Sequence, residues 1–360
     1  MIFPRLYKKT KTGAVQQWEI FTEDNLISVT FGQWRGKQQV KETLCEAKNI
    51  GRANETTPAE QATQEAQAKW GKKINAGYVE EHSGESVIKL PMKVKKYQGQ
   101  EKNIIFSCYA SPKLNGVNGE WRLTSSGLKL LSRGGKEYPI LEHERGLVEA
   151  TMRRLGTDSL NVELYCHGMF LEEITSAVKK HNENTPQIQS FLFELPTFDA
   201  PYSHKQDIFW QYGSYIGMPV IDIVQLYTHE EIIAYHEECV EQGYEGIVIR
   251  NARCRYEYGV RSSDAFKYKI PLDAEFMIDS FQIDKNGHPV FWMKNPKGAD
   301  FKCKPKGTDE KRKKIITEFE ERYKGQWYTV EFESWSMYGV PLKPVGVGLR
   351  ECNEQGEPLV

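Results

Sequence analysis

The most informative stretch of this chain is Ala110-Ser111-Pro112-Lys113-Leu114-Asn115-Gly116-Val117-Asn118-Gly119-Glu120. Its lysine, Lys113, lies just past a predicted strand over 104–110, and a turn that contains two glycines follows the lysine. Glycine lets a backbone approach a ligand closely. Lys113 is therefore either a solvated turn residue or, when desolvated beside other cations, a nucleophilic amine.

Further short motifs follow downstream, most of them on predicted strands over 161–166, 189–195, 246–250 and 265–270. In chain order the motifs are Ser132-Arg133-Gly134-Gly135, Val162-Glu163-Leu164-Tyr165, Phe191-Leu192-Phe193-Glu194-Leu195, Tyr244-Glu245-Gly246-Ile247-Val248-Ile249-Arg250 and Phe266-Lys267-Tyr268-Lys269.

The ordered series resembles the motifs of covalent nucleotidyltransferases, and specifically of ATP-dependent DNA ligases, over residues 101–271. The tail resembles the OB domain of these ligases. The tail segments that carry this likeness are Lys302-Cys303-Lys304-Pro305-Lys306-Gly307-Thr308-Asp309, Tyr338-Gly339-Val340-Pro341 and Pro344-Val345-Gly346-Val347.

The resemblance implies a catalytic set of Lys113, Lys267 and Lys269. Lys113 would attack the α-phosphate of ATP and hold AMP as a phosphoramidate. Lys267 and Lys269 alternate on one strand, so both can point at the same phosphate and stabilise the transition state. The implied ATP site comprises Ser111, Arg133, Glu163, Phe193, Glu245, Lys267 and Lys269.

The resemblance also implies Mg²⁺, held by Glu163 and Glu245. Hydrated Mg²⁺ prefers one or two carboxylates together with phosphate oxygens. Phe193 would stack on adenine, and Arg133 would bind a DNA 5′-phosphate as a fork. From the residues alone, other interpretations remain open. Glu163 and Glu245 are then solvated acids at strand ends, Phe193 is an ordinary core residue, and Arg133 forms a surface salt bridge.

The chain departs from the family pattern in two places. DNA ligases usually carry KxDGxR, and here Asn115 and Asn118 stand where aspartate and arginine are expected. Arg122 is a hypothetical substitute for the missing arginine. In the tail the usual Pro-Arg pair is absent, and Lys343 or Arg350 are its candidate replacements.

The N-terminal part forms a basic module. Residues 1–100 hold 16 Lys and Arg against 11 Asp and Glu, and the remainder holds 32 against 38. The segments 31–36 and 72–78, with Trp70, resemble a WGR-like module, a type associated with nucleic-acid binding. The alternative to nucleic-acid binding is that the tryptophans of this part are core residues and that its lysines form a solvated face. Candidate phosphate contacts are Arg5, Lys8, Lys9, Lys11, Arg35 and Lys37.

We therefore expect an α+β, multi-domain chain. Its parts are a WGR-like module over 1–90, a linker over 91–100, an ATP-grasp-like adenylation domain with antiparallel sheets over 101–271, and an OB-fold barrel over 272–360. A second basic patch lies between 302 and 314. It is either a DNA contact or a face laced with ion pairs.

Composition narrows the protein class further. No stretch approaches the roughly 20 apolar residues of a membrane span, and the seven cysteines form no CxxC pair. The start of the chain lacks an apolar signal region. These features predict a cytoplasmic protein of a reducing compartment, in the host cytoplasm if phage-encoded, and we expect a monomer.

The predicted function is ATP-dependent sealing of broken or nicked double-stranded DNA between 3′-hydroxyl and 5′-phosphate ends. An RNA ligase with the same chemistry is one alternative. The other alternative is a nucleic-acid-binding protein that has lost catalysis. Asn115 and Asn118 suggest this hypothesis, because they replace the usual aspartate and arginine. A capping guanylyltransferase fits less well, because the tail lacks a clear RxDK.

Overall fold

The computed structural model describes residues 1–10, 12–80 and 90–359. The chain divides into two compact units. One comprises Met1–Pro91 with Leu131–Glu137, and the other comprises Met92–Leu130 with Tyr138–Val360. Within the described residues, no helix is both long and apolar enough to cross a membrane.

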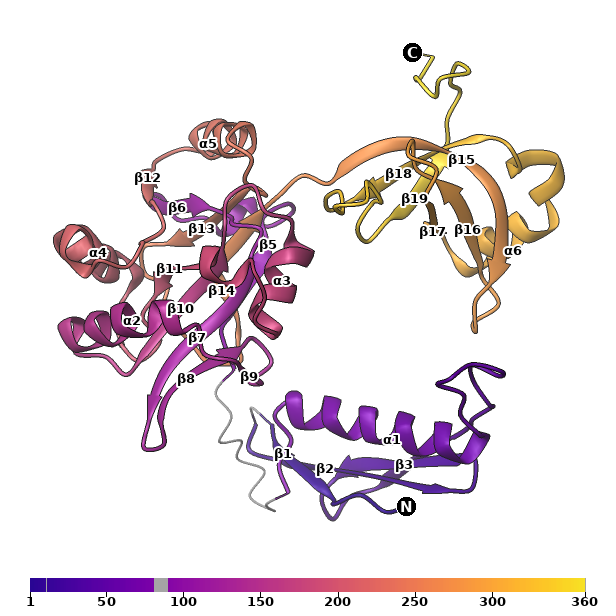
Figure 1. Ribbon diagram of the computed structural model, residues 1–360, viewed down its shortest axis with the longest axis horizontal. Helices are drawn as coiled ribbons and strands as arrows, with labels where there is room; N and C mark the ends of the chain where they lie inside the picture. The colour runs from indigo at the N-terminus through magenta and orange to yellow at the C-terminus, as the bar shows by residue number, and fades with distance from the viewer. Residues whose placement is uncertain (11, 81–89, 360) are drawn as a thin grey trace. The chain divides into compact units, whose positions relative to one another are not determined.

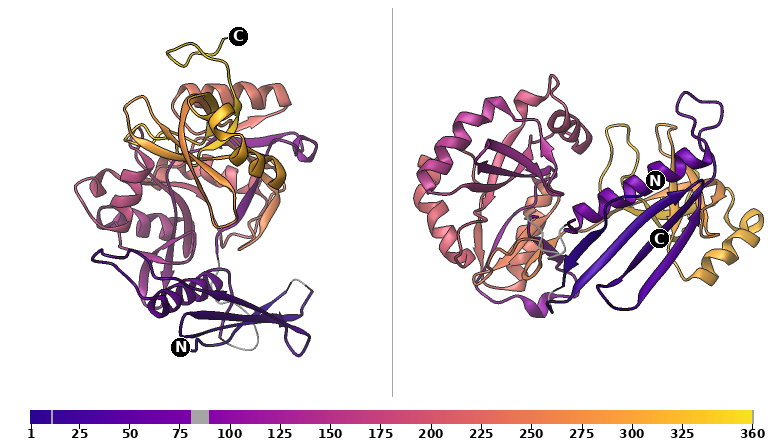
Figure 2. Two further views of the ribbon diagram at one scale, coloured as in Figure 1. Left: turned by 90° about the vertical axis from the view of Figure 1, so that its right-hand side faces the viewer. Right: turned by 90° about the horizontal axis from the view of Figure 1, so that it is seen from below.

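The N-terminal module is a four-stranded antiparallel sheet with one helix across a face (Figure 1, Figure 2). Trp18, Ile20 and Ile27 from that face are buried against Ala62 and Ala66 of the helix. The small alanines let the helix lie close to the sheet. The elements are β1 (Leu6–Lys9), β2 (Val15–Glu23), β3 (Leu26–Gln33), β4 (Gln38–Leu44) and α1 (Pro58–Asn75).

Helix α1 begins where its capping residues predict. The Thr57 hydroxyl accepts from the Glu60 N–H at 3.3 Å, and the Glu60 carboxylate accepts from the Thr57 N–H at 2.8 Å. Pro58 occupies the first turn, where its missing N–H costs nothing. Gly77, at φ +83°, follows the last turn.

The central domain contains two five-stranded sheets, in the orders β11-β10-β7-β8-β9 and β12-β6-β13-β14-β5. Strand β10 pairs antiparallel with β11 and β7, β6 pairs antiparallel with β12 and β13, and β13 pairs antiparallel with β14, whereas β14 and β5 are parallel. The predicted antiparallel sheets are therefore confirmed. Their strands are β5 (Lys93–Lys96), β6 (Cys108–Pro112), β7 (Val117–Thr124), β8 (Gly127–Ser132), β9 (Glu137–Tyr138), β10 (Ser159–Tyr165), β11 (Gln189–Glu194), β12 (Val224–Leu226), β13 (Ile247–Asn251) and β14 (Arg261–Tyr268).

Each of these sheets buries one face under helices. Trp121, Val162 and Leu192 of the first sheet lie in one core, and Ile249 and Phe266 of the second lie in another. Because side chains alternate along a strand, the polar residues between them share the opposite faces. The helices are η1 (Glu101–Asn103), α2 (Glu142–Leu155), α3 (Leu171–Lys179), η2 (Thr185–Gln187), α4 (Tyr202–Ile216) and α5 (His229–Glu241).

The C-terminal domain is a closed five-stranded barrel in the order β15-β16-β17-β19-β18, which confirms the predicted barrel. Phe276, Phe291, Met293 and Val330 fill its core. The elements are β15 (Leu272–Ile283), β16 (Pro289–Lys294), β17 (Asp300–Pro305), α6 (Asp309–Thr317), η3 (Phe319–Tyr323), β18 (Trp327–Phe332) and β19 (Val345–Leu349).

Two local differences from expectation concern the strands around the site. The strand expected over 104–110 starts only at Cys108 and continues to Pro112. The segment 91–100, expected to be a linker, contains β5, which pairs with β14. Its lysine-rich sequence suits the edge of a sheet, where charged side chains reach water.

Candidate active site

Lys113 directly follows β6, beside the start of β13. Its N–H donates to the Gly246 carbonyl at 2.7 Å, and the Glu245 N–H donates to the Lys113 carbonyl at 3.0 Å. Pro112 lies opposite Ile247 in the same antiparallel pair. The backbone itself thus brings together two motifs that lie far apart in the sequence.

Gly246 is required where β13 passes β14. Its φ is +140°, and a Cβ at this position would lie 2.3 Å from the Tyr268 carbonyl oxygen and 3.2 Å from the Lys269 Cα. Any side chain would push the end of β14 away. Glycine therefore keeps Lys269 beside Glu245.

The Glu245 carboxylate lies between two lysines. It accepts from the Lys113 ammonium and, at 2.7 Å, from the Lys269 ammonium. The three side chains are only 14–23% exposed. Burial opposes the ionisation of Glu245, but the charge and hydrogen bond of Lys113, followed by those of Lys269, outweigh it and lower its pKa.

Lys267 lies on the same strand face as Lys269, as expected. It lies opposite Val248 of β13, which lies opposite Ser111 of β6. Burial first, and then the positive charges of Lys269 and Lys113, lower the pKa of Lys267. The face therefore concentrates positive charge and suits a polyanionic ligand such as a triphosphate.

Glu163 comes from the other sheet and lies against the turn that follows Lys113. A Cβ on Gly116 would lie 2.9 Å from the Glu163 Cγ and 2.5 Å from the Leu164 carbonyl oxygen. Glycine at position 116 therefore allows the turn to touch β10. On β10, Glu163 lies opposite Asn118 and Phe191.

Phe193 occupies a β-bulge in β11. Asn161 lies opposite Glu194 while the next residue, Val162, lies opposite Leu192, so Phe193 is an extra residue in its strand. Bulges re-aim a side chain and occur often beside active sites. The ring is half-buried and touches the first sheet's core, so it combines a core contact with an accessible surface.

Two of the predicted site residues have contrasting positions. Ser111 is buried on β6, on the same face as Lys267. Arg133 is exposed in the turn between β8 and β9, where the Ser132 hydroxyl accepts from the Lys136 N–H.

Asn118, which stands where the family has arginine, and Arg122, its hypothetical substitute, both lie on β7. The Asn118 amide donates to Asn161 at 2.9 Å. Arg122 lies about 13 Å along the strand from Asn118, at ~3.3 Å per residue. Its guanidinium donates to the buried Glu120 carboxylate at 2.7 Å. Arg122 is therefore held by Glu120, which does not support the idea that it substitutes for the missing arginine.

Sequence reasoning missed Glu333, which follows β18. Its carboxylate lies 3.2 Å from the Lys269 ammonium and accepts from Lys343 at 2.5 Å. Lys343 is thus one carboxylate away from Lys269, one of the predicted catalytic lysines. Within the part of the chain that the structure describes, Arg350 makes no contact of this kind, so the geometry favours Lys343 as the replacement for the missing tail arginine. Glu333 belongs to no recognisable motif, so no sequence signal could have found it.

The candidate phosphate contacts of the N-terminal module differ in their exposure and in the groups that they contact. Lys8 donates to the Ala76 carbonyl at the end of α1, at 2.5 Å. Arg35, in the exposed β3–β4 turn with Lys37, lies 6.0 Å from the Trp34 ring. Lys9 is exposed at the end of β1, and Arg5 pairs with Glu19. Lys11 lies outside the described residues.

The second basic patch is largely ion-paired. Lys304 pairs with Asp284, Lys306 with Glu331, Lys313 with Asp309 and Lys314 with Glu318. This arrangement favours the interpretation as an ion-laced face over a DNA contact.

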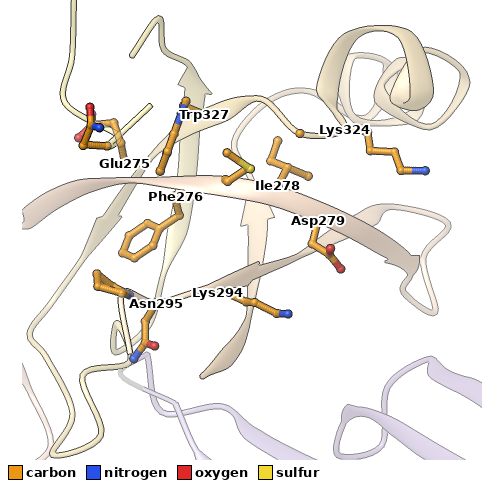
Figure 3. A pocket seen from close by; sticks show the side chains of 12 residues that line it. Glu275, Phe276, Ile278, Asp279, Lys294, Asn295, Lys324 and Trp327 are labelled. Carbon is orange, nitrogen blue, oxygen red and sulfur yellow. The ribbon is translucent and has the colours of Figure 1, made fainter. Parts of the chain in front are cut away.

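A hollow of about 540 Å³ lies in the barrel (Figure 3). Phe276 and Trp327 contribute apolar surface, and Lys294, Lys324 and Asp279 contribute charge. None of the predicted site residues lines it. It is therefore not the nucleotide site expected from the sequence.

The donor set of the site fits Mg²⁺ better than a metal held by the protein alone. Among residues 1–10, 12–80 and 90–359, no three His, Cys, Asp or Glu side chains gather as a ready metal cage. Glu245 instead lies between Lys113 and Lys269, and Glu163 lies against the turn that follows Lys113. Mg²⁺ that is bound mainly through substrate phosphates takes only one or two such carboxylates from the protein.

Two viral DNA ligases are similar to this chain over nearly its whole length. The DNA ligases of African swine fever virus from a Kenyan pig isolate and from the Badajoz strain are 24% and 26% identical to this chain over 400 residues. Both alignments cover 97% of this chain and 94% of the relative.

Solved structures show the same fold. A Lig E DNA ligase matches 73% of this chain and 100% of its own, at a TM-score of 0.59 and 18% identity. The structure titled Pmar-Lig_Pre. matches 82% and 74%, at a TM-score of 0.63 and 16% identity. The family model for the ATP dependent DNA ligase domain matches residues 91–269. The chain is therefore a member of the ATP-dependent DNA ligases.

Proposed function

We propose that this ligase joins a 3′-hydroxyl to a 5′-phosphate in duplex DNA, with Lys113 as the residue that carries AMP. One observation supports this most strongly. Lys113, Glu245 and Lys269 are joined by side-chain hydrogen bonds at the meeting point of three strand ends, in a largely buried cluster. A solvated turn lysine would have no such partners.

In the first step, the Lys113 nitrogen attacks the α-phosphorus of ATP. A nitrogen–phosphorus bond forms, the bond from the α-phosphorus to the bridging oxygen breaks, and pyrophosphate leaves. The amine attacks after it has lost a proton. Lys267 and Lys269 stabilise the negative charge that develops on the phosphates.

The family uses ATP together with Mg²⁺. When bound, Mg²⁺ neutralises phosphate charge and acts as a Lewis acid. We assign Glu163 and Glu245 as its protein ligands. Ser111 contributes to the ATP site, and Phe193 forms the surface on which adenine stacks. The bulge that makes Phe193 an extra residue in β11 supports this last role.

In the later steps, AMP passes from Lys113 to the 5′-phosphate at the break. The 3′-hydroxyl then attacks that phosphate, the strand is joined and AMP leaves. We assign Arg133 to the 5′-phosphate. Arg35 and Lys37, exposed together in one turn, are the N-terminal residues best placed to contact the DNA backbone, with Lys9 and Lys8 as weaker candidates. We expect a monomer that acts in the cytoplasm.

A gel assay tests this function directly. The purified chain, ATP and Mg²⁺ are incubated with a labelled nicked DNA duplex and, in parallel, with a duplex that carries a matched nicked RNA strand. Sealing of the DNA nick is the expected result. Sealing of RNA alone would move the chain to the RNA ligases, and sealing of neither would favour a binding protein without catalysis.

A further inference from the structure

Arg250 is a buried cation on the same sheet face as the catalytic lysines. On β13 it lies two residues after Val248, opposite Tyr109 of β6 and Ala265 of β14. Since Val248 lies opposite Ser111 and Lys267, Arg250 shares their face. The residue is only 5% exposed.

The Arg250 guanidinium reaches across to the other sheet. Its central carbon lies 5.7 Å from the centre of the Phe193 ring and 4.7 Å from the centre of the Tyr202 ring. Both distances are within cation–π range. Arg250 therefore contacts the ring that the proposed function assigns to adenine stacking.

The hydrogen bonds of Arg250 are incomplete. One terminal nitrogen donates to the Tyr202 hydroxyl at 3.2 Å, whereas the buried Nε has no partner among the described residues. The nearby Glu194 carboxylate already accepts from the Lys205 ammonium at 2.6 Å and from the Leu195 N–H at 2.9 Å. The buried carboxylate of Glu194 is therefore paired with Lys205 rather than with Arg250.

Stability alone does not account for this arrangement. Burying an incompletely paired charge is costly, and apolar residues of similar volume often replace buried ionic groups at no loss of stability. A guanidinium buried here against an aromatic ring on a bulge therefore indicates a role at that ring.

We propose that Arg250 is a positioning residue that holds the Phe193 ring in the orientation in which it stacks on the purine of ATP. This inference depends on the proposed function, because it requires Phe193 to be the purine surface. Phe193 is an extra residue in its strand, so the regular strand ladder constrains it less than its neighbours. The cation–π contact and the Tyr202 hydrogen bond then supply the constraint.

The test is a double-mutant cycle on the full chain. Arg250→Met, Phe193→Leu and the double variant are assayed for transfer of AMP to the protein at increasing ATP concentration, so that KM and the maximal rate separate. Arg250→Met should raise the KM for ATP about fivefold to tenfold and leave the maximal rate near that of the parent. In the Phe193→Leu background it should add little.

Two further variants protect the test from a folding artefact. Arg250→Lys keeps the charge and should restore part of the affinity, and Tyr202→Phe removes only the hydroxyl that Arg250 contacts and should raise KM slightly. Arg253→Met is the matched control, because Arg253 is 68% exposed and pairs with Asp264. It should behave as the parent.

The outcomes separate the two claims. If Phe193→Leu leaves KM unchanged, the purine surface itself is wrong. If Phe193→Leu raises KM but Arg250→Met and Tyr202→Phe do not, the positioning role is wrong. Additive effects of Arg250→Met and Phe193→Leu, or equal falls in maximal rate and affinity, would also contradict it.

Discussion

Replacing Gly246 by alanine should disable the site through the backbone rather than through chemistry. Two costs add at this position. The φ of +140° is strained for any L side chain, which costs about 1–3 kcal/mol. The new Cβ would also lie 2.3 Å from the Tyr268 carbonyl oxygen, and relief of such overpacking costs about 1–3 kcal/mol more.

The predicted loss for Gly246→Ala is therefore about 2–6 kcal/mol of folding free energy. Adenylation should fall with it, because relief of the clash moves β14 and takes Lys269 away from Glu245. Urea unfolding and AMP transfer to the protein measure the two effects.

Gly99→Ala is the matched control for this experiment. Gly99 also has a positive φ, of +77°, but nothing lies within 4 Å of its would-be Cβ. It should show only the smaller conformational cost and keep adenylation. Equal stability and equal activity of the two variants would refute the argument from close approach.

Three other predictions concern separate parts of the chain. Lys343→Met should slow adenylation about tenfold or more, because it removes a cation near the phosphate site, whereas Arg350→Met should not; equal rates would contradict the assignment. Arg35→Ala with Lys37→Ala should leave adenylation intact but weaken DNA binding and flatten its dependence on salt, measured as log Kd against log salt concentration; an unchanged slope would remove these residues from the interface. Thr57→Ala should cost about 1 kcal/mol in urea unfolding through the lost helix cap, and no loss would show that the cap is dispensable.

The elements that carry their own local signals were predictable. Helix α1 has a capping box and Pro58, and both are present in the structure. The β7–β8 hairpin follows from two β-rich runs around Ser125-Ser126-Gly127. In contrast, β5 is too polar to be recognised, since it is a strand only through its pairing with β14.

The residues of the site also divide into those that carry a local sequence signal and those that do not. Lys113, Glu245 and Lys269 lie in motifs, so the sequence alone could single them out as candidate site residues. Glu333 and Arg250 could not be assigned roles, because an alternating pattern gives the face of a residue but not the strand or carboxylate beside it. Those contacts depend on which strands pair, and local sequence does not specify this.

The most direct test of the account is the location of AMP on the protein. The chain is incubated with ATP and Mg²⁺, its intact mass is measured, and the modified peptide is identified by mass spectrometry. The account predicts one AMP per chain, attached at Lys113, absent from Lys113→Ala and retained in the surface control Lys102→Ala. AMP on another residue, or an unmodified parent protein beside an active reference ligase, would contradict it.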